Sequence, residues 1–419
     1  MLKTVVVLTN QTERTEMEAG AAGGALSGIK IVDLARVLGG PYCTQMLADH
    51  GADVIKIEPP QGDETRDWGP PFLSDGTSAY FSGVNRNKQS IGLDLSKPQG
   101  REVLLRLLAD ADVLTENFKP GTLEKWGLGY EHVLSAKFPR LVHARLTGFG
   151  ADGPMGGFPG YDAMVQAWAG FNSVNGTPEG GPVRLGIPMV DLGTGLHLAV
   201  GILMALLERH RSGKGQFLEV TLYDAAISLQ HPHATNWFGG EMTPELVGNA
   251  HPTLAPYDQF RTRGRNVVTG AGNDAQFRRL CTIIGRPDLA DDARFKTNKD
   301  RSANRLALAA AINSAVSERD GEQLAMELMR AGVPAGVVQS VPDVLRHPHT
   351  LHRKMVVTKD GYKGTGWPAK LSRTPASLRS TPPRYGAATF EVLRQLGYDE
   401  NEIKALLQSG IALTERTST

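Results

Sequence analysis

Cysteine is nearly absent from this chain, since Cys43 and Cys281 are the only two among 419 residues. Two cysteines cannot build a disulfide framework or a zinc site made of several cysteines. So low a content is typical of proteins that work in a reducing compartment. The sequence therefore predicts a cytoplasmic protein.

An excess of charge of one sign is missing as well. Lys and Arg together number 45 and Asp and Glu 44, so the formal net charge is +1 at pH 7. A chain this close to neutral has no global field to draw it to nucleic acid or to an anionic membrane. We therefore expect no nucleic-acid partner, and any bound anion must be held by a local group of basic residues.

Long hydrophobic runs are also missing. The longest, from Leu198 to Leu207, has about half the length that a bilayer requires. The apolar stretch at residues 4–9 is too short for the core of a signal peptide, and charged residues follow it. The sequence predicts no membrane association, and residues 1–27 are interpreted as an N-terminal extension.

The composition that remains is that of a globular protein, with 41% hydrophobic and 21% charged residues. Segments typical of strands and helices alternate from the start, with a strand over 29–34, a helix over 41–49 and a strand over 52–58. A strand, a helix and a strand in succession indicate a parallel sheet. The fold class expected is α/β, with a Rossmann-like large domain and a smaller α/β domain.

The domain boundaries follow changes in this pattern, because a chain of this length is long for one domain. We expect the large domain to begin with residues 28–225. A linker and the smaller domain are expected over 226–340, and residues 341–419 are expected to return to the large domain.

The first strand–helix–strand segment is similar to a dinucleotide-binding unit. Glu58 follows Gly39 by about twenty residues, where an acid would hold a ribose. The glycine fingerprint of such units is absent, however, and Pro41 removes an N–H donor from the start of the helix. NAD is therefore not expected, and no metal is expected because the histidines lack the spacing of a metal site.

Asp191 is the candidate reactive residue. It stands beside Gly193 and Gly195, at the start of a helical pattern over 192–209. As a helix N-cap, its side chain would accept free backbone N–H groups, and the helix dipole would keep it ionised at neutral pH. An ionised carboxylate among glycines is also accessible enough to attack an acyl carbon. Both interpretations, a cap and a nucleophile, stay open at this point.

Other segments suit a phosphorylated ligand with an aromatic base. Residues 85–88 place two cations before a strand, and residues 117–121 follow a strand at the edge where open α/β sheets bind ligands. Phe118 can stack on a planar base, and Lys119 or Lys125 can meet phosphates. Each segment taken alone is equally compatible with a solvated turn.

Together these motifs resemble the class III CoA-transferases, which include formyl-CoA transferase and carnitine CoA-transferase. The resemblance extends from about residue 28 to residue 412. It rests on residues 28–33, 40–47, 51–58, 85–88, 116–121, 148–150, and on Asp191 with Gly193 and Gly195. It implies an interlocked homodimer whose substrates are an acyl-CoA and a carboxylic acid. It also places the family's catalytic aspartate at Asp191, which attacks the thioester and then carries CoA as an aspartyl-CoA thioester.

The same resemblance, with the segments above, gives the candidate contacts to coenzyme A. They are Val37, Leu38, Gly39, Arg66, Arg86, Lys88, Leu93, Asn117, Phe118, Lys119, Lys125, Tyr161 and Asp162. The chain departs from the family in two places. Some members have glutamine where Leu38 stands, and an arginine that contacts a CoA phosphate falls at Pro59, so Arg66 is expected to take its place.

Two alternatives to a transferase remain. The α-methylacyl-CoA racemases share the fold and need a histidine beside the aspartate, where this chain has Tyr161. Because the ordinary pKa of tyrosine is about 10, Tyr161 is poorly suited to proton exchange at neutral pH. A catalytically silent CoA-binding protein is the second alternative.

Segments 270–277, 296–298 and 301–305 resemble the branch of the family that moves CoA among dicarboxylic acids. The resemblance implies succinyl-CoA as the donor and a glutarate-, itaconate- or malate-like acceptor. Arg184 is a candidate for binding the distal carboxylate in a bidentate manner.

Overall fold

The computed structural model describes residues 23–416, so most of the predicted N-terminal extension lies outside the described residues. The chain divides into two compact units. The larger comprises the described residues up to Ala169, Gly186–Gln230 and the chain from Lys354 onward. The smaller comprises Gly170–Leu185 and His231–Arg353. Residues 170–185 and 341–353 thus belong to the smaller unit, whereas the sequence pattern had placed them with the large domain.

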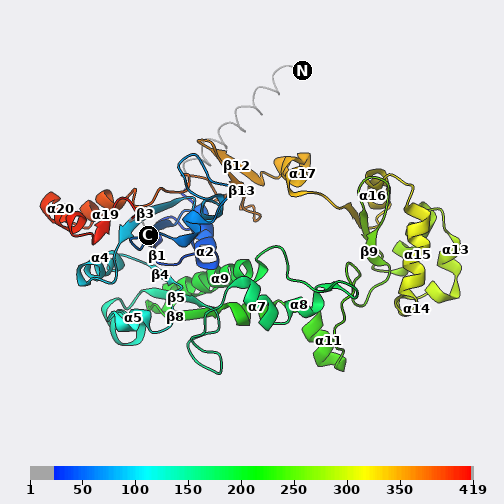
Figure 1. Cartoon of the computed structure of the whole chain (residues 1–419), viewed down its shortest axis with the longest axis horizontal. Coiled ribbons are helices and arrows are strands. Elements are labelled where there is room, and N and C mark those ends of the chain that lie inside the picture. The colour runs from blue at the N-terminus through cyan, green and yellow to red at the C-terminus, as the bar shows by residue number, and fades with distance from the viewer. Residues whose placement is uncertain (1–22, 417–419) are drawn as a thin grey trace, which may run out of the picture. The chain divides into compact units, whose positions relative to one another are not determined.

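The larger unit is built on a seven-stranded sheet with the order β14-β3-β2-β1-β4-β5-β8 (Figure 1). Its strands are β1 (Lys30–Asp33), β2 (Asp53–Glu58), β3 (Lys88–Leu93), β4 (Val113–Glu116), β5 (Val142–Thr147), β8 (Phe217–Thr221) and β14 (Ala412–Leu413). All neighbours pair in parallel except β14, which runs antiparallel to β3. The predicted α/β class and parallel sheet are confirmed. The strand order reverses between β1 and β4, which opens a crevice at their carboxyl ends.

Helices and short strands surround this sheet. The helices are α2 (Gly39–Asp49), α3 (Ala79–Ser82), α4 (Pro98–Leu108), α5 (Thr122–Lys125), α6 (Ser135–Lys137), α7 (Asp162–Trp168), α9 (Met189–Ser212), α10 (Leu222–Ser228), α19 (Thr389–Gln395) and α20 (Glu400–Gln408). The tighter turn η1 (Glu64–Asp67), the π-helical turn η2 (Tyr130–Leu134) and the hairpin β12 (Val356–Lys359) with β13 (Tyr362–Thr365) complete the unit. Helix α9 packs against α2, β5, β8 and α10 (Figure 1).

Helix α9 is long and apolar enough to cross a membrane, and it is the one such helix among residues 23–416. Half of its most apolar window is buried inside the protein. Leu198 and Ile202 are fully buried, and the helix ends at Gly213, whose φ of 76° is the usual left-handed terminator. These features are those of a core helix that positions residues at its N-terminus.

Glycines let α2 and α9 approach each other closely. A Cβ atom on Gly195 would lie 2.6 Å from the carbonyl oxygen of Gly39, and one on Gly39 would lie 3.1 Å from that of Asp191. A backbone oxygen cannot move aside as a side chain can, so larger residues would force the two helices apart. Sequence reasoning took the glycines near Asp191 to leave its carboxylate accessible, whereas in the structure Gly195 lets the two helices pack closely.

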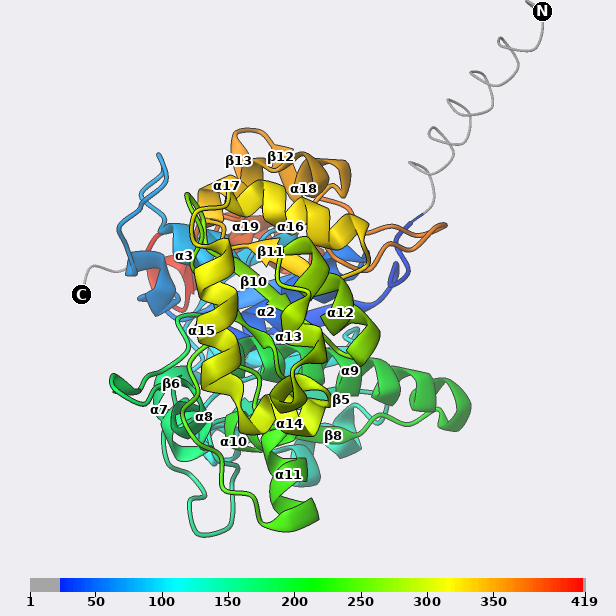
Figure 2. The same cartoon turned by 90° about the vertical axis from the view of Figure 1, so that its right-hand side faces the viewer.

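The smaller unit contains an antiparallel sheet with the order β11-β10-β9, of which Figure 2 labels β10 and β11. The strands of this sheet are β9 (Tyr257–Phe260), β10 (Val267–Gly270) and β11 (Ala335–Val337). The unit also pairs β6 (Gly176–Thr177) with β7 (Gly181–Pro182) in a separate two-stranded sheet. Its helices are α8 (Phe171–Val174), α11 (His233–Gly240), α12 (Asp274–Ile283), α13 (Asp288–Asp291), α14 (Asn298–Ala303), α15 (Arg305–Val316), α16 (Gly321–Arg330), α17 (Val341–Arg346) and α18 (Pro348–His352), with the turn η3 (Ala293–Phe295). Helices α15 and α16 pack on the sheet of β9, β10 and β11 and share an apolar core with α12.

Candidate active site

A cavity of about 300 Å³ opens at the carboxyl ends of β1, β4 and β5 in the larger unit. This is the place where the strand order reverses and where open α/β sheets bind ligands. The predicted site residues that line it are Val37, Leu38, Gly39, Asn117, Phe118, Lys119, Tyr161 and Asp191. They come together because the loops that follow parallel strands all leave the sheet at the same edge.

Asp191 is the third residue of α9 and does not cap it. The helix begins at Met189, and its N-cap residue, Pro188, makes no side-chain hydrogen bond. The cap comes from Asp162, the first residue of α7, whose Oδ2 accepts the backbone N–H groups of Val190 at 2.8 Å and of Asp191 at 3.1 Å. The prediction that Asp191 caps its own helix is therefore wrong.

Asp162 is itself held in a fixed orientation. It is buried, with 8% of its surface exposed, and its Oδ1 accepts a hydrogen bond from Gln166 one turn further along α7. With both oxygens engaged, the carboxylate cannot turn away from the start of α9. Asp162 therefore fixes the backbone that carries Asp191.

The Asp191 carboxyl is in an environment that favours its protonated form. Burial, and then the charge of Asp162, raise the pKa of Asp191 to about 7. No Lys or Arg among the described residues forms an ion pair with it that would oppose this shift. The expectation that the helix dipole keeps Asp191 firmly ionised is wrong, because burial and a second carboxylate outweigh it. A carboxylate with a pKa near neutrality is more basic than an ordinary aspartate, yet is substantially ionised at pH 7.

The loop between β1 and α2 forms one wall of the cavity and is tightly held. The Asn117 side chain accepts the N–H of Arg36 at 2.9 Å and donates to the carbonyl oxygen of Arg36 at 2.8 Å. The next residue, Val37, has a φ of 71°, which is unusual for a β-branched side chain. Its N–H faces Asp63 Oδ1 at 3.4 Å. Such strained residues are kept where surrounding contacts impose them, and they gather at functional sites.

Tyr161 lies at the mouth of the cavity and is about half exposed. Its hydroxyl donates to Glu64 Oε1 at 3.4 Å. The charge of Glu64, and then burial, raise the pKa of Tyr161 above its ordinary value. This shift takes the hydroxyl further from neutrality and argues against a racemase in which Tyr161 exchanges a proton with the substrate.

The structure adds residues that sequence reasoning did not select. Arg36, Glu64 and Phe158 line the cavity. Burial, and then the charges of Asp191 and Asp162, raise the pKa of Tyr80 to about 12. Tyr80 therefore lies within electrostatic range of both carboxylates. Arg36 directly precedes the selected segment 37–39 and could have been included with it, but no motif marks the other residues.

Six predicted contact residues do not line the cavity: Asp162, which instead holds the start of α9, and Arg66, Arg86, Lys88, Leu93 and Lys125. Arg66 donates to both carboxylate oxygens of Glu58, at 2.8 and 2.7 Å. Arg86 engages Asp49 in the same bidentate manner. Two guanidinium groups that were candidates for phosphate binding therefore form internal ion pairs.

The remaining three also have evident structural settings. Lys88 is buried against Asp33, and burial lowers its pKa to about 8. Leu93 belongs to the apolar core, and Lys125 ends the short helix α5 on the surface. Contacts of these residues with CoA stay a prediction.

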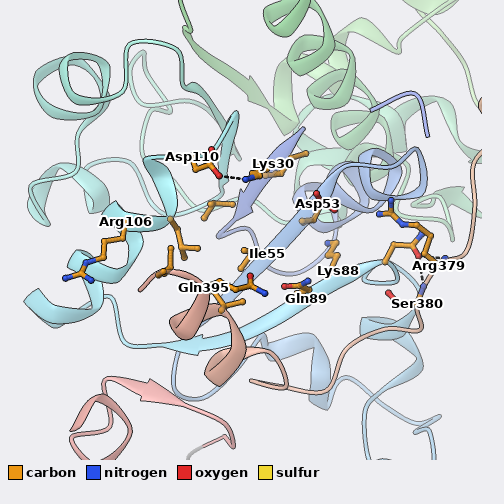
Figure 3. A pocket seen from close by; sticks show the side chains of 18 residues that line it. Lys30, Asp53, Ile55, Lys88, Gln89, Arg106, Asp110, Arg379, Ser380 and Gln395 are labelled. Carbon is orange, nitrogen blue, oxygen red and sulfur yellow. Dashed lines mark hydrogen bonds and ion pairs between the residues drawn. The ribbon is translucent and has the colours of Figure 1, made fainter. Parts of the chain in front are cut away.

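A second and larger cavity, of about 550 Å³, lies at the opposite ends of the strands (Figure 3). Its wall includes Lys30, Asp53 and Lys88, the first residues of β1, β2 and β3. The ammonium group of Lys30 pairs with Asp110 across this cavity. Ligands of doubly wound sheets bind at the carboxyl ends instead, so the smaller cavity with Asp191 is the candidate active site.

A doubly wound sheet with a cavity and two neighbouring carboxylates at its reversal point is the arrangement of an α/β protein that binds a small molecule there. The chain belongs to CoA-transferase family III, whose family model matches residues 26–389. It is a CoA-transferase, and the resemblance inferred from sequence motifs is confirmed.

Two named relatives illustrate the family. A succinate–glutarate CoA-transferase of Agrobacterium fabrum is 39% identical, over 94% of this chain and 97% of its own length. A succinyl-CoA:mesaconate CoA-transferase of Haloarcula marismortui is 38% identical, over 90% of this chain and 97% of its own length. A solved structure, a CAIB/BAIF family protein from Brucella suis, is 40% identical with a TM-score of 0.82, covering 90% of this chain and 100% of that one.

Proposed function

We propose that this protein transfers CoA from succinyl-CoA to a free dicarboxylic acid through covalent intermediates on Asp191. The observation that carries the proposal is the carboxyl of Asp191, which lines the cavity at the sheet's reversal point with a pKa raised to about 7. The relatives named for succinyl-CoA and for glutarate or mesaconate support the substrate class.

The reaction has four acyl-transfer steps. A carboxylate oxygen of Asp191 attacks the thioester carbon, the C–S bond breaks, and an aspartyl anhydride forms as CoA thiolate leaves. The thiolate attacks the aspartyl carbonyl, which releases the donor acid and leaves an aspartyl-CoA thioester. The acceptor carboxylate attacks this thioester to give a second anhydride and thiolate. The thiolate then attacks the acceptor's acyl carbon, which yields the new acyl-CoA and free Asp191. No acyl bond is lost to water, so the thioester's energy is conserved.

Each anhydride and thioester forms through a tetrahedral oxyanion, which must be stabilised. The first N–H groups of α2 have no partners within that helix and begin at Gly39, on the cavity wall. We assign the oxyanion contact to these backbone groups, because Leu38 has no polar side chain. Asp162 positions Asp191, and we assign contacts with the CoA moiety to Phe118 and Lys119 because both line the cavity.

The proposal is tested by incubating the protein with succinyl-CoA and a panel of free acids, followed by chromatography of the acyl-CoA products. We expect new thioesters with dicarboxylic acids. Exchange of deuterium into the α-carbon of a 2-methylacyl-CoA without any acceptor acid would instead indicate a racemase. No product with any acid, together with tight CoA binding, would indicate the silent CoA-binding protein.

We also propose that the protein works in the cytoplasm as an interlocked homodimer. Leu196, Val200, Leu203 and Leu207 form an exposed apolar stripe along α9, since they recur at helical spacing. A stripe of this kind is typically covered by a partner, and a second copy of the chain is the simplest one. Light scattering coupled to size exclusion should give the mass of two chains, and the mass of one chain would contradict the proposal.

A further inference from the structure

Arg36, which is only partly buried, differs from the well-buried arginines of the larger unit. Arg66 and Arg86 each donate two or more hydrogen bonds to a carboxylate, and Arg145 bridges two glutamates. The Arg36 side chain makes no hydrogen bond to any residue within 23–416, and its Nε is buried without a partner. Its nearest acid is Glu64, with 3.7 Å between Nη1 and Oε2.

Arg36 is nevertheless held at the cavity. Its backbone is fixed by both groups of the Asn117 side-chain amide, and its side chain is only 31% exposed on the wall that it shares with Tyr161 and Asp191. A buried guanidinium N–H without an acceptor costs free energy that a suitable ligand oxygen would recover. Because guanidinium presents its donors in a planar fork, the best-matched ligand is an oxygen acid bound through two oxygens.

We propose that Arg36 binds the second, non-reacting carboxylate of the dicarboxylic acyl group and thereby makes the enzyme select dicarboxylic substrates. This rests on the proposed function. An acyl group that reacts at Asp191 must occupy this cavity, so its free carboxylate is the anion that can reach Arg36. The ion pair of Arg36 with Glu64 is long and partly exposed, and an ion pair of this kind is exchanged at little cost.

The terminal phosphate of CoA offers similar oxygen chemistry, and the test must distinguish the two. The variant Arg36→Gln removes the charge and the fork, whereas Arg36→Lys keeps the charge alone. We expect kcat/KM for succinyl-CoA to fall roughly 10²-fold in Arg36→Gln, as for the loss of one partner of a buried charge pair, and less in Arg36→Lys. With acetyl-CoA as donor and isotope-labelled acetate as acceptor, so that the exchange can be detected, the slow rate of the variant should equal that of the wild type. Arg394→Gln, on the surface of α19, is the matched control and should leave both rates unchanged.

Three outcomes overturn the assignment. Equal losses with succinyl-CoA and acetyl-CoA would show that Arg36 does not select the acyl group. A loss that disappears when 3′-dephospho-CoA thioesters replace CoA thioesters would show that Arg36 binds the CoA phosphate. Wild-type preference for succinyl-CoA retained in a folded Arg36→Gln, with its melting temperature unchanged, would place the selective cation elsewhere. If the wild-type protein transfers CoA to no acid at all, the proposed function fails independently of Arg36.

Discussion

The carboxyls of the larger unit that lie out of solvent, wholly or in part, have pKa values shifted in opposite directions. Asp33, Glu58 and Asp63 are fully buried, and burial alone would raise their pKa values. Lys88 and Lys56 outweigh burial at Asp33, and Arg66 does so at Glu58, so these carboxyls have lowered pKa values. Asp191 meets another carboxylate instead of a cation, and its pKa is raised to about 7.

We propose that this difference separates the structural carboxylates from the reactive one. A buried carboxylate surrounded by cations and donors is stable and poorly reactive, since its lone pairs are already used. A buried carboxylate beside a second one is destabilised in the ionised form and gains free energy when it forms a neutral anhydride or thioester.

Asp191→Asn should abolish CoA transfer. Because the amide cannot act as the nucleophile, we expect transfer from succinyl-CoA to fall by roughly 10³-fold or more. Product formation measured by chromatography of acyl-CoA esters checks this. The fold should not be harmed, so circular dichroism of the variant serves as its control, and a well-folded variant with wild-type turnover would show that Asp191 is not the nucleophile.

Asp33→Asn should lower the stability of the fold. The carboxylate of Asp33 faces Lys88 and accepts hydrogen bonds from Thr44 and Thr115, so its loss leaves a buried ammonium without its counter-ion. We expect the free energy of unfolding to fall by about 3 kcal/mol, measured in urea. The matched control is Asp110→Asn, which removes an exposed ion pair and should cost less than about 0.5 kcal/mol. Equal losses would mean that burial of the pair has no energetic weight.

Gly195→Ala should disturb the frame that holds Asp191. The added methyl group meets the carbonyl oxygen of Gly39 at 2.6 Å, whereas in Gly193→Ala it meets only the flexible end of Leu229 at 2.7 Å. We expect the first variant to lose about 2 kcal/mol of stability together with activity, and the second to lose clearly less of both. Thermal unfolding and turnover of the pair of variants measure this, and the reverse order would argue against tight α2–α9 packing.

The pH dependence of stability should reveal the cost of the Asp191 charge. The folded pKa of about 7 exceeds the ordinary, unfolded value, so the penalty is absent at low pH, grows as pH rises and is complete above about pH 7. Relative to Asp191→Asn, wild type should lose about 4 kcal/mol of unfolding free energy between about pH 4 and pH 8, since each unit of pKa shift corresponds to about 1.4 kcal/mol. Urea unfolding at several pH values measures this difference, and a difference independent of pH would contradict the raised pKa.

The parallel sheet was predictable because its strands are short apolar runs. The segments predicted at 29–34, 41–49 and 52–58 match β1, α2 and β2 to within two residues. The cavity was partly predictable for the same reason, since residues that follow parallel strands must meet at one edge, as Val37 and Asn117 do.

The interaction partners of individual charged side chains were not predictable from the sequence. In the sequence, Arg66, Arg86 and Lys88 look like phosphate ligands. In the structure, each forms an ion pair with an acidic residue that only the fold brings near. The cap of α9 is a further case, because Asp162 lies 28 residues before Val190. A local pattern can show that a group is charged, but its partner depends on tertiary packing.

The central claim is that Asp191 carries CoA and acyl groups covalently. The most direct test is mass spectrometry of the protein quenched after mixing with succinyl-CoA in the absence of an acceptor, with borohydride reduction that converts an aspartyl anhydride or thioester to the stable alcohol and releases its acyl or CoA group. The account predicts a modification on the peptide that contains Asp191 and none in Asp191→Asn. An active enzyme that is modified at another residue, or that shows no covalent intermediate at any time point, would contradict it.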